Sequence, residues 1–378
     1  MSVLTAPAST RVIDLVAESG LTGRGGGSFP VHRKLTAAVG RRPRLVVNAC
    51  EGEPWSVKDR WIVENDPGPL LAGATALARA VGARRVLLAV HEGSPTHRAA
   101  ERLDLDGHGI ELLGAPGGYV ASEASALVSF LDGGPAVPVT HRAPLAVGDR
   151  RHPAAVVQNA ETVYRVGQLL DRGVDWFRRH GTPDEPGPRF FSLSGAVAGG
   201  PRVVEAGAGV GLAELVAAVG GYTEPVRAVL ASGWSGSWLG WAEAGLVPWS
   251  DEGLRPLGAG VGNGIVHLLP ASVCPLVAVG AQLDALARAS AGQCGPCLFG
   301  LPAVADDWRR LTAGEPGVLD RLRRRLGLLP GRGGCHHPDG AARNAASALR
   351  VFADHLPTHA QGGGRSAGRP ACPATRGV

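Results

Sequence analysis

The chain has 378 residues, 44% of them hydrophobic and 19% charged. It can therefore bury apolar cores, and its length predicts two or three domains. This composition excludes a mainly disordered protein or a coiled coil, and the 56 glycines and 29 prolines indicate a loop-rich globular protein because they follow no Gly-X-Y period. The net charge of +5 is spread along the chain and only 5% of residues are aromatic, so we expect no nucleic-acid partner.

The sequence contains no targeting or membrane element that we can recognise. Residues 1–20 lack a basic segment followed by an apolar one. The most apolar stretch, 264–281, is interrupted by His267, Pro270 and Pro275, which is unsuited to a membrane span. We therefore expect a soluble, cytoplasmic protein with no direct membrane insertion. Six cysteines are too few for a disulfide scaffold, and in a reducing compartment they point to metal or redox chemistry.

Strands and helices alternate over the first 165 residues. Apolar runs predict strands at 44–48, 85–90 and 110–113, and a helix at 69–81. Ser122 is predicted to cap the next helix, which carries Ala126, Leu127, Phe130 and Leu131 on one face. This alternation predicts an α/β domain with a largely parallel sheet. Ligands of such sheets bind at the carboxyl ends of the strands.

The remainder of the chain predicts two further units. The turn-rich stretch 180–188 reads as a linker. The next unit is a small α+β one, with strands at 190–195, 202–205 and 226–231 and a helix at 212–219. Apolar spacing then predicts a small helical bundle, with helices at 276–289, 303–311, 319–326 and 342–356. Trp234, Trp238, Trp241 and Trp249 predict one local core, with a partner surface as the alternative.

The first cluster that could carry chemistry is a glycine-rich loop. It reads Gly23-Arg24-Gly25-Gly26-Gly27-Ser28-Phe29-Pro30, with Lys34 shortly after. Successive glycines let backbone N–H groups surround an anion, and a lysine adds a point charge for a phosphate. No strand precedes the loop, so it does not match the dinucleotide-binding fingerprint, and an ordinary loop is the alternative.

The second cluster follows the first predicted strand. It runs from Asn48 to Pro54 through Glu51 and Glu53, with Lys58, Asp59 and Arg60 close behind. Carboxylates at the end of a strand could hydrogen-bond ribose or nicotinamide groups, whereas the alternative is a solvated charged loop. Lys34 and Lys58 are the only lysines among 38 basic residues. Because arginine does not replace the compact charge of lysine, their place in these two clusters favours function.

The third cluster is cysteine-rich. Cys294 and Cys297 form a C-x-x-C, and Cys335-His336-His337 follows after a helical interval. Two thiolates on a tight turn chelate one metal centre and a third can close the site. Zinc bound by three cysteines and one histidine and an iron–sulfur cluster both remain open. Cys50, Cys274 and Cys372 read as ordinary or buried cysteines.

The order of these motifs resembles the flavin- and NADH-binding subunit of respiratory complex I, the F-subunit family of NADH-quinone oxidoreductase, and its relatives in NAD-linked hydrogenases and formate dehydrogenases. The resemblance covers residues 10–357, and the chain reads as a divergent short member. Four motifs carry it, namely Gly23–Pro30 with Lys34, Asn48–Pro54 with Lys58–Arg60, Tyr119–Leu127, and Gln158–Thr162.

The resemblance implies three units and a tail. These are an FMN-binding α/β domain (1–180), a β-grasp domain of the soluble-ligand-binding type (188–272), a helical iron–sulfur domain (276–357) and a disordered tail (358–378). It also implies that Glu51, Glu53 and Phe29 face NADH and that Glu123 lies near the flavin, the three glutamates forming the catalytic set. The implied cofactor-binding residues are Gly23, Arg24, Gly25, Gly26, Gly27, Phe29, Lys34, Asn48, Gln158, Asn159 and Thr162.

The sequence departs from the family pattern at Gly27 and Ser28 in the glycine loop, in a shorter stretch between Val90 and Tyr119, and at three further positions. Ala291 stands where the family has the first cluster cysteine, Cys50 replaces an aspartate and Ala124 replaces a glutamate. Cys294, Cys297 and Cys335 could hold a [4Fe–4S] cluster with a non-cysteine fourth ligand, a [3Fe–4S] cluster, or zinc. His336 and His337 are the candidates for the open position.

The expected function is flavin- and iron–sulfur-dependent electron transfer. The protein would oxidise NAD(P)H, or accept electrons from a ferredoxin, and pass them to a redox partner protein, either ferredoxin-like or a membrane reductase subunit, or to a quinone-linked chain. The expected location is the cytoplasm or the periphery of a membrane complex. The alternative is a non-catalytic assembly or scaffold subunit with zinc or no cluster in the three-cysteine site.

Overall fold

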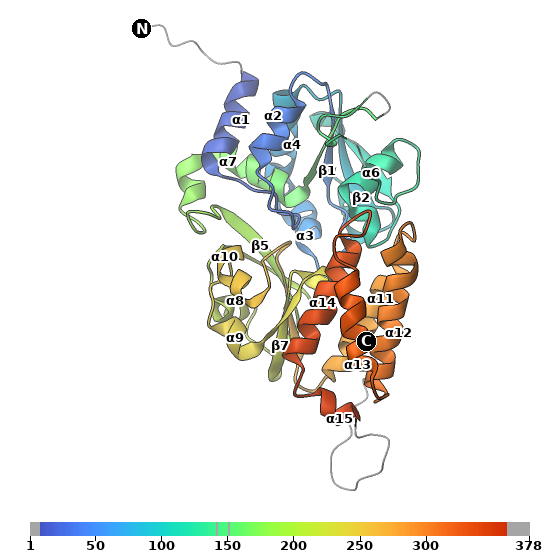
Figure 1. Cartoon of the computed structure of the whole chain (residues 1–378). Coiled ribbons are helices and arrows are strands. Elements are labelled where there is room, and N and C mark those ends of the chain that lie inside the picture. Colours follow the sequence, from blue (N-terminus) through green and yellow to red (C-terminus); the bar gives the residue numbers. More distant parts are fainter. Residues whose placement is uncertain (1–7, 141–142, 150–151, 361–378) are drawn as a thin grey trace.

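A computed structural model describes residues 8–140, 143–149 and 152–360 of the chain. Figure 1 shows a parallel sheet with its helices at one end and, at the other, a second sheet beside a helical bundle. The parallel sheet has four strands in the order β3-β2-β1-β4. Its strands are β1 (Arg44–Asn48), β2 (Arg85–His91), β3 (Glu111–Ala115) and β4 (Ala155–Asn159), and every pairing is parallel.

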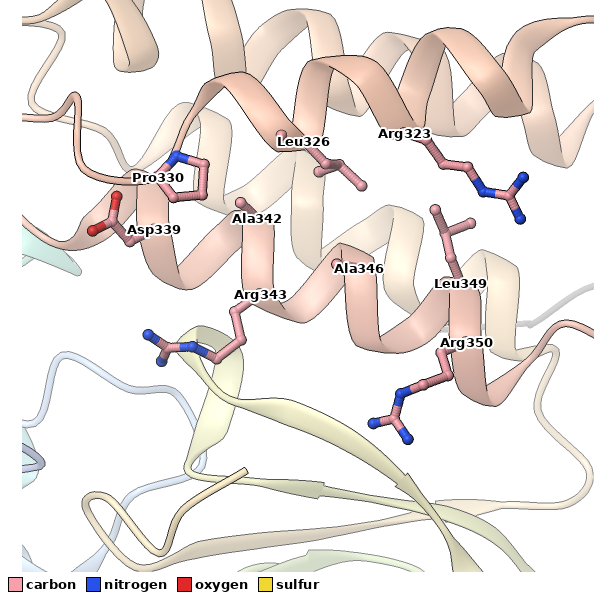
Figure 2. A pocket seen from close by; sticks show the side chains of 10 residues that line it. Arg323, Leu326, Pro330, Asp339, Ala342, Arg343, Ala346, Leu349 and Arg350 are labelled. Carbon is pink, nitrogen blue, oxygen red and sulfur yellow. The ribbon is translucent and has the colours of Figure 1, made fainter. Parts of the chain in front are cut away.

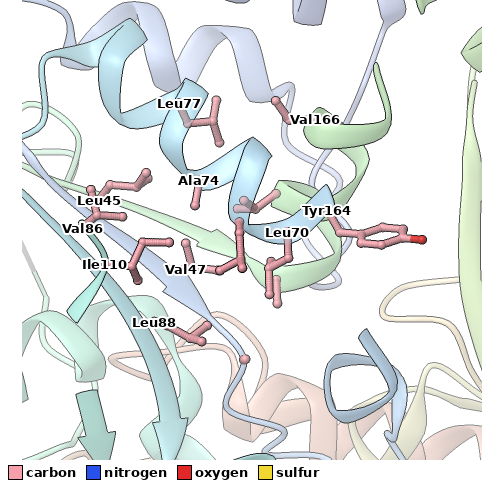
Figure 3. Packing of buried hydrophobic residues seen from close by; sticks show 14 of the residues in the cluster. Leu45, Val47, Leu70, Ala74, Leu77, Val86, Leu88, Ile110, Tyr164 and Val166 are labelled. Atoms are coloured by element: carbon pink, nitrogen blue, oxygen red, sulfur yellow. The ribbon is translucent and has the colours of Figure 1, made fainter. Parts of the chain in front are cut away.

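Alternate side chains of these strands pack on opposite faces, as the two-residue period of a strand requires. Leu45 and Val47 join one core, which Figure 3 shows with Leu70, Ala74 and other residues of neighbouring elements. The helices on that face are α1 (Ala8–Ser19), α2 (Val31–Ala38), α3 (Lys58–Asn65), α4 (Pro67–Val81), α5 (Pro95–Ala100) and α7 (Ala160–Arg178). Val46 joins the core on the other face, against α6 (Ala124–Leu131).

The second sheet is mixed, with five strands in the order β6-β5-β9-β7-β8. Its strands are β5 (Pro188–Gly195), β6 (Arg202–Gly207), β7 (Val226–Ala231), β8 (Ser237–Gly240) and β9 (Ile265–Pro270). One face packs on α8 (Leu212–Ala218), α9 (Trp241–Gly245) and α10 (Asp251–Leu254), and the other packs on the bundle. The sheet therefore lies between two separate cores.

The bundle consists of α11 (Pro275–Arg288), α12 (Leu301–Thr312), α13 (Val318–Leu328) and α14 (His337–Val351), followed by the short α15 (Leu356–Ala360). One turn of π-helix, Pro296–Gly300, precedes α12. A cavity of about 580 Å³ lies between α13 and α14, with Arg323, Arg343 and Arg350 around its apolar wall (Figure 2). No helix in the part of the chain that the structure describes is long and apolar enough to cross a membrane.

The structure corrects several details of the sequence analysis. Glu123, not Ser122, caps α6, since its side chain accepts hydrogen bonds from the backbone N–H groups of Ser125 and Ala126. The prediction of one tryptophan core is wrong, because Trp238 and Trp249 are both fully buried but in cores on opposite faces of the second sheet.

The last predicted helix, 342–356, is also divided. α14 ends at Val351 and Leu356 begins α15. The predicted tail begins at 358, but helix α15 continues to Ala360. The rest of the predicted tail, which includes Cys372, lies outside the described residues.

Candidate active site

A cavity of about 760 Å³, which we call the central cavity, lies where the parallel sheet, the second sheet and the bundle meet. It lies beside the carboxyl ends of β1 and β4, where α/β sheets bind ligands. Its volume is suited to a cofactor-sized ligand. Residues from all the sequence motifs share its wall, among them Gly25, Gly26, Gly27, Asn48, Glu51, Glu53, Glu123, Asn159, Cys335, His336 and His337.

The glycine loop forms part of this wall, and contacts between its two ends fix its path. Thr22 and Pro30 form an antiparallel bridge, and the Gly23 N–H donates to the Phe29 carbonyl at 2.9 Å. Gly26 has a φ of +103°, which side chains rarely allow. A Cβ on Gly25 would lie 3.2 Å from the Cβ of Asn159. The loop backbone therefore approaches β4 more closely than a loop with side chains could.

Lys58 holds three segments of the wall together. Its Nζ donates to the Arg24 carbonyl at 2.6 Å, to Asn159 Oδ1 at 3.4 Å and to Glu161 Oε2 at 2.7 Å. Both Lys58 and Glu161 are buried. Burial opposes ionisation of Glu161, but the positive charges of Lys58, Arg165 and Arg24 outweigh it and hold its pKa below the usual value. The second lysine of the sequence therefore acts as a buried link between the glycine loop, β4 and α7.

Asn48 and Asn159 are paired with each other as the last residues of the neighbouring strands β1 and β4. Asn48 donates from Nδ2 to the Ser122 carbonyl at 2.8 Å, and Asn159 donates from Nδ2 to Asp59 Oδ2 at 2.9 Å. The other oxygen of Asp59, Oδ1, is buried and has no hydrogen-bond partner among the described residues. Burial raises the pKa of Asp59 to about 6, although the positive charge of Lys58 opposes this shift. An unpartnered carboxylate oxygen beside a cavity suits a ligand that brings hydroxyl or N–H groups.

Glu51 and Glu53 stand on either side of Gly52. Glu51 accepts from Ser56 Oγ and from the backbone N–H of Asp59, both at 3.0 Å. Burial and then the nearby charge of Asp59 raise its pKa to about 8. Glu53 accepts from the hydroxyl of Tyr119 and from the Trp234 N–H at 2.9 Å, and burial raises its pKa to about 6. Both carboxylates are thus poised to change protonation near neutral pH.

Six of the residues predicted to bind a cofactor lie outside the wall of the described cavity: Gly23, Arg24, Phe29, Lys34, Gln158 and Thr162. Arg24 is buried, where it donates from Nη2 to the Pro186 carbonyl at 2.7 Å and from its backbone N to Thr162 Oγ1 at 2.9 Å. Lys34 donates from Nζ to the Val157 carbonyl at 3.0 Å. Arg24 and Thr162 therefore stabilise the glycine loop without lining the central cavity.

The cysteines gather at the bundle end of the central cavity. Cys335 lies in the cavity wall, whereas Cys294 and Cys297, the latter in the π-helical turn, do not line it. Burial opposes ionisation of Cys294, but the N–H groups of Gly334 and Cys297 hold its pKa below the usual thiol value. The three sulfur atoms do not all lie within 4.8 Å of one another. The thiols of Cys294 and Cys297 are nevertheless close enough to hydrogen-bond with each other.

The two candidate histidines differ sharply. His336 is fully exposed and its Nδ1 lies 3.5 Å from Asp339 Oδ2. His337 is 6% exposed, and its Nε2 contacts the Leu286 carbonyl at 2.8 Å. Because a carbonyl only accepts, Nε2 must carry the proton, which leaves Nδ1 as an acceptor. That buried Nδ1 has no hydrogen-bond partner among the residues that the structure describes, as expected of a metal ligand.

Several residues of the wall were not predicted from the sequence. Tyr119 bonds to Glu53 and to Ser235 Oγ, and Arg343 donates from Nη1 to the Ser235 carbonyl at 3.0 Å. Ser235 is 182 residues from Glu53, so no local spacing pattern could have linked the two. Tyr119 lies within a recognised motif, which was the one available signal.

Comparison with known proteins defines the class. The Nuo51 FMN-binding domain family matches residues 16–168, and the NADH-ubiquinone oxidoreductase-F iron-sulfur binding region matches residues 278–359. The chain is thus a protein with a flavin-binding domain and an iron–sulfur region. The residues present fit both groups, given the glycine loop, the unpartnered Asp59 oxygen, the three cysteines and the unpartnered His337 nitrogen.

Relatives with assigned names agree with this class. The chain is 32% identical over 375 residues to the F 2 subunit of NADH-quinone oxidoreductase from Rhizobium meliloti (92% of this chain, 88% of that protein). It is 30% identical over 376 residues to the F subunit of the same enzyme from Streptomyces coelicolor (93% and 84%). It is 27% identical over 373 residues to the HndC subunit of the NADP-reducing hydrogenase from Solidesulfovibrio fructosivorans (92% and 76%).

A solved structure agrees too. The crystal structure of an NAD+-reducing [NiFe]-hydrogenase in the H2-reduced state matches with a TM-score of 0.84 and 29% identity, over 94% of this chain and 64% of that chain. The chain belongs to the F-subunit family of NADH-quinone oxidoreductase. It is an NADH dehydrogenase-like oxidoreductase that uses FMN and an iron–sulfur cluster to transfer electrons from NAD(P)H. Because these relatives are subunits, a redox partner protein is expected.

Proposed function

We propose that the central cavity holds both FMN and the nicotinamide substrate, and that electrons leave it through a cluster bound at its bundle end. The observation that carries this proposal is that the glycine loop, the two strand-end asparagines and Cys335 share one wall. When bound, the flavin accepts an electron pair from nicotinamide and releases electrons singly to iron–sulfur. A cavity that holds the nicotinamide electron donor at one end and the iron–sulfur acceptor at the other suits this change from two-electron to one-electron transfer.

The protein side chains have separate roles in this proposal. The backbone of Gly25, Gly26 and Gly27, with Asn48 and Asn159, holds FMN. Glu51 and Glu53 orient the nicotinamide substrate through carboxyl groups whose pKa values are raised by burial to about 8 and about 6. Glu123 has its carboxylate on the N-terminus of α6, with 2.8 Å to the Ser125 N–H, and thereby fixes the wall segment beside the flavin. Contacts of Phe29, Lys34 and Gln158 with FMN or NADH stay predictions.

We propose His337 as the fourth ligand of the cluster in place of the missing cysteine at Ala291. Its buried Nδ1 has no partner in the described part of the chain, and the Leu286 carbonyl fixes the other ring nitrogen as the donor. The exposed His336 lacks both features. Four protein ligands favour [4Fe–4S] over [3Fe–4S].

We also propose the division into units that the resemblance implies. Residues 1–180 would be the FMN-binding domain, 188–272 the β-grasp domain and 276–357 the iron–sulfur domain. The mixed sheet with α8 against one face supports the β-grasp proposal. We propose that the protein works in the cytoplasm or at the periphery of a membrane complex.

Electron exit is proposed to be at the π-helical turn. Leu298 and Phe299 directly follow Cys297, and they are 51% and 75% exposed. Apolar side chains exposed beside a cluster suit the docking of a redox protein. The partner proposed is a ferredoxin-like protein or a membrane reductase subunit.

Cofactor analysis of the anaerobically purified full chain tests the proposal. We expect about one FMN per chain and close to four irons, the content of one [4Fe–4S] cluster. His337→Ala should lose most of the iron and retain FMN, whereas His337→Cys should recover iron, and His336→Ala is the matched control that keeps it. Absence of FMN from the parent protein would overturn the assignment of the cavity. Full iron in His337→Ala would overturn only the assignment of the fourth ligand.

A further inference from the structure

A second group of metal-type ligands lies outside the central cavity. Among the described residues, Cys274, His355 and His359 are the one set of three or more His, Cys, Asp or Glu whose ligand atoms all lie within 4.8 Å of one another. Cys274 directly precedes α11, His355 lies between α14 and α15, and His359 lies in α15. The histidines are 81 and 85 residues from the cysteine in the sequence. We propose that these three side chains bind one zinc ion, independently of the iron–sulfur site.

The distances agree with a tetrahedral centre. The Cys274 sulfur lies 3.6 Å from His355 Nε2 and 3.4 Å from His359 Nε2. Zinc bonds of about 2.3 Å to sulfur and about 2.0 Å to nitrogen put ligand atoms about 3.5 Å apart at tetrahedral angles. An ion can therefore enter between the three atoms with little movement of the backbone.

The contacts around His359 prepare it as a ligand. Its Nδ1 lies 2.7 Å from the Thr312 carbonyl at the end of α12. Because a carbonyl accepts only, Nδ1 carries the proton of the neutral ring and Nε2 presents its lone pair to the sulfur. A backbone carbonyl on the far nitrogen is the arrangement that orients histidine ligands in metal sites.

The ligand types select the metal class. One thiolate and two imidazoles suit zinc, a borderline ion that accepts both sulfur and nitrogen. Two histidines and one cysteine also occur in copper electron-transfer sites, whose usual additional ligand is a methionine. The only methionine in this chain is Met1, which favours zinc. Cys274 is 1% exposed and the two histidines are half-buried, so a water molecule can complete the coordination from the open side.

The metal would cross-link and stabilise the end of the bundle. In Figure 1, α15 lies at the end of the bundle remote from the parallel sheet. A metal there joins the beginning of α11 to the connection between α14 and α15 and to α15 itself. Such a bond contributes directly to folding, because it forms only in the folded chain.

Metal analysis of the purified full chain tests this site. We expect about one zinc per chain in addition to the iron, and less than a tenth of that in Cys274→Ser and in His359→Gln. Iron and FMN should be unchanged in both variants. Cys294→Ser, which removes a proposed cluster ligand, should keep the zinc, and the exposed-histidine variant His108→Ala should keep both metals.

A second readout covers the case in which a variant folds poorly. Co2+ added to the chelator-treated parent protein should give the visible bands of a tetrahedral thiolate site, and His359→Gln should weaken Co2+ binding by about 100-fold or more. Copper in place of zinc would overturn the metal assignment. Zinc retained in Cys274→Ser but lost in Cys294→Ser would place the ion at the other cysteines, and no zinc or Co2+ uptake by the parent would overturn the site.

Discussion

At the scale of single residues, Lys58 shows why one buried charge matters. Both side chains of the Lys58–Glu161 pair are buried. Removing one partner therefore leaves the charge of the other unpaired in the low-dielectric interior. Lys58→Met should lower the free energy of unfolding by about 3 kcal/mol. The cost is at the lower end of the range for such changes because Arg165 Nη2 still lies 3.6 Å from Glu161. Denaturant titration measures it.

Two matched variants separate this effect from general damage. Arg85→Met breaks the exposed pair with Glu111 and should cost less than about 1 kcal/mol. The double variant Lys58→Met/Glu161→Gln should regain part of the loss, because no unpaired charge stays buried. Equal costs for the buried and the exposed pair would show that Lys58 is not the link described here.

Glu51 gives the protein a characteristic pH dependence. Its pKa is raised to about 8 in the folded chain, mainly by burial, whereas an unfolded glutamate titrates near 4.3. Between these values the folded state holds a proton that the unfolded state has lost. The free energy of unfolding should therefore fall as the pH rises, by up to about 1.4 kcal/mol per unit from this group.

Glu51→Gln should flatten that decline between pH 6 and pH 8. Denaturant titrations of both proteins across this interval test it. Glu53, with a pKa raised to about 6 by burial, contributes a decline mostly below pH 6 and serves as the internal comparison. The same pH dependence in the parent protein and in Glu51→Gln over pH 6 to 8 would contradict a raised pKa of Glu51.

At the scale of elements, the glycine loop depends on its close approach to β4. Gly25→Ala would put a Cβ 3.2 Å from Asn159, which must displace the loop or the asparagine. We expect FMN affinity to fall by about tenfold or more, equivalent to about 1.4 kcal/mol of lost binding free energy. Fluorescence titration of the apoprotein with FMN measures this.

Gly68→Ala is the control for that substitution. Gly68 lies in the first turn of α4, and a Cβ there meets nothing within 4 Å. It should leave FMN affinity unchanged and slightly raise stability, since alanine favours helix over glycine. Unchanged affinity in Gly25→Ala as well would exclude the proposed packing of the loop on β4.

The elements also show what sequence patterns can predict. The strand at 44–48 has the predicted bounds because a short apolar run is buried on both faces of the sheet. β9 was missed because its apolar run continues into α11 without a periodic signal, and β8 because it has only four residues. Ser122 was chosen as a cap by residue type, whereas Glu123 reaches the free N–H groups.

For the site, motifs predicted residues near each other in sequence better than their partners across the fold. Asn48, Glu51 and Glu53 line the central cavity as one strand-end segment. The bond from Tyr119 to Ser235 joins residues 116 apart, and the approach of Cys274 to the bundle histidines likewise depends on tertiary packing. No local pattern specifies such contacts.

At the scale of the whole molecule, the proposed function puts the nicotinamide site in the central cavity and the electron exit at the π-helical turn Pro296–Gly300. The exposed Phe299 beside Cys297 should matter only for the passage of electrons to a protein. Phe299→Ser should slow NADH-driven reduction of a ferredoxin by about tenfold, the effect of losing one apolar anchor worth about 1.4 kcal/mol. Reduction of ferricyanide, which needs no docking surface, should stay unchanged. Equal slowing with both acceptors would instead place the effect at the cluster itself.

We expect this chain to take electrons from a nicotinamide nucleotide through its flavin. The most direct test adds NADH, and separately NADPH, under argon to the anaerobically purified full chain and follows the flavin absorption. We predict that at least one nucleotide bleaches the flavin and that the iron–sulfur signal is reduced next. A bound flavin that is bleached by dithionite but by neither NADH nor NADPH would contradict this prediction.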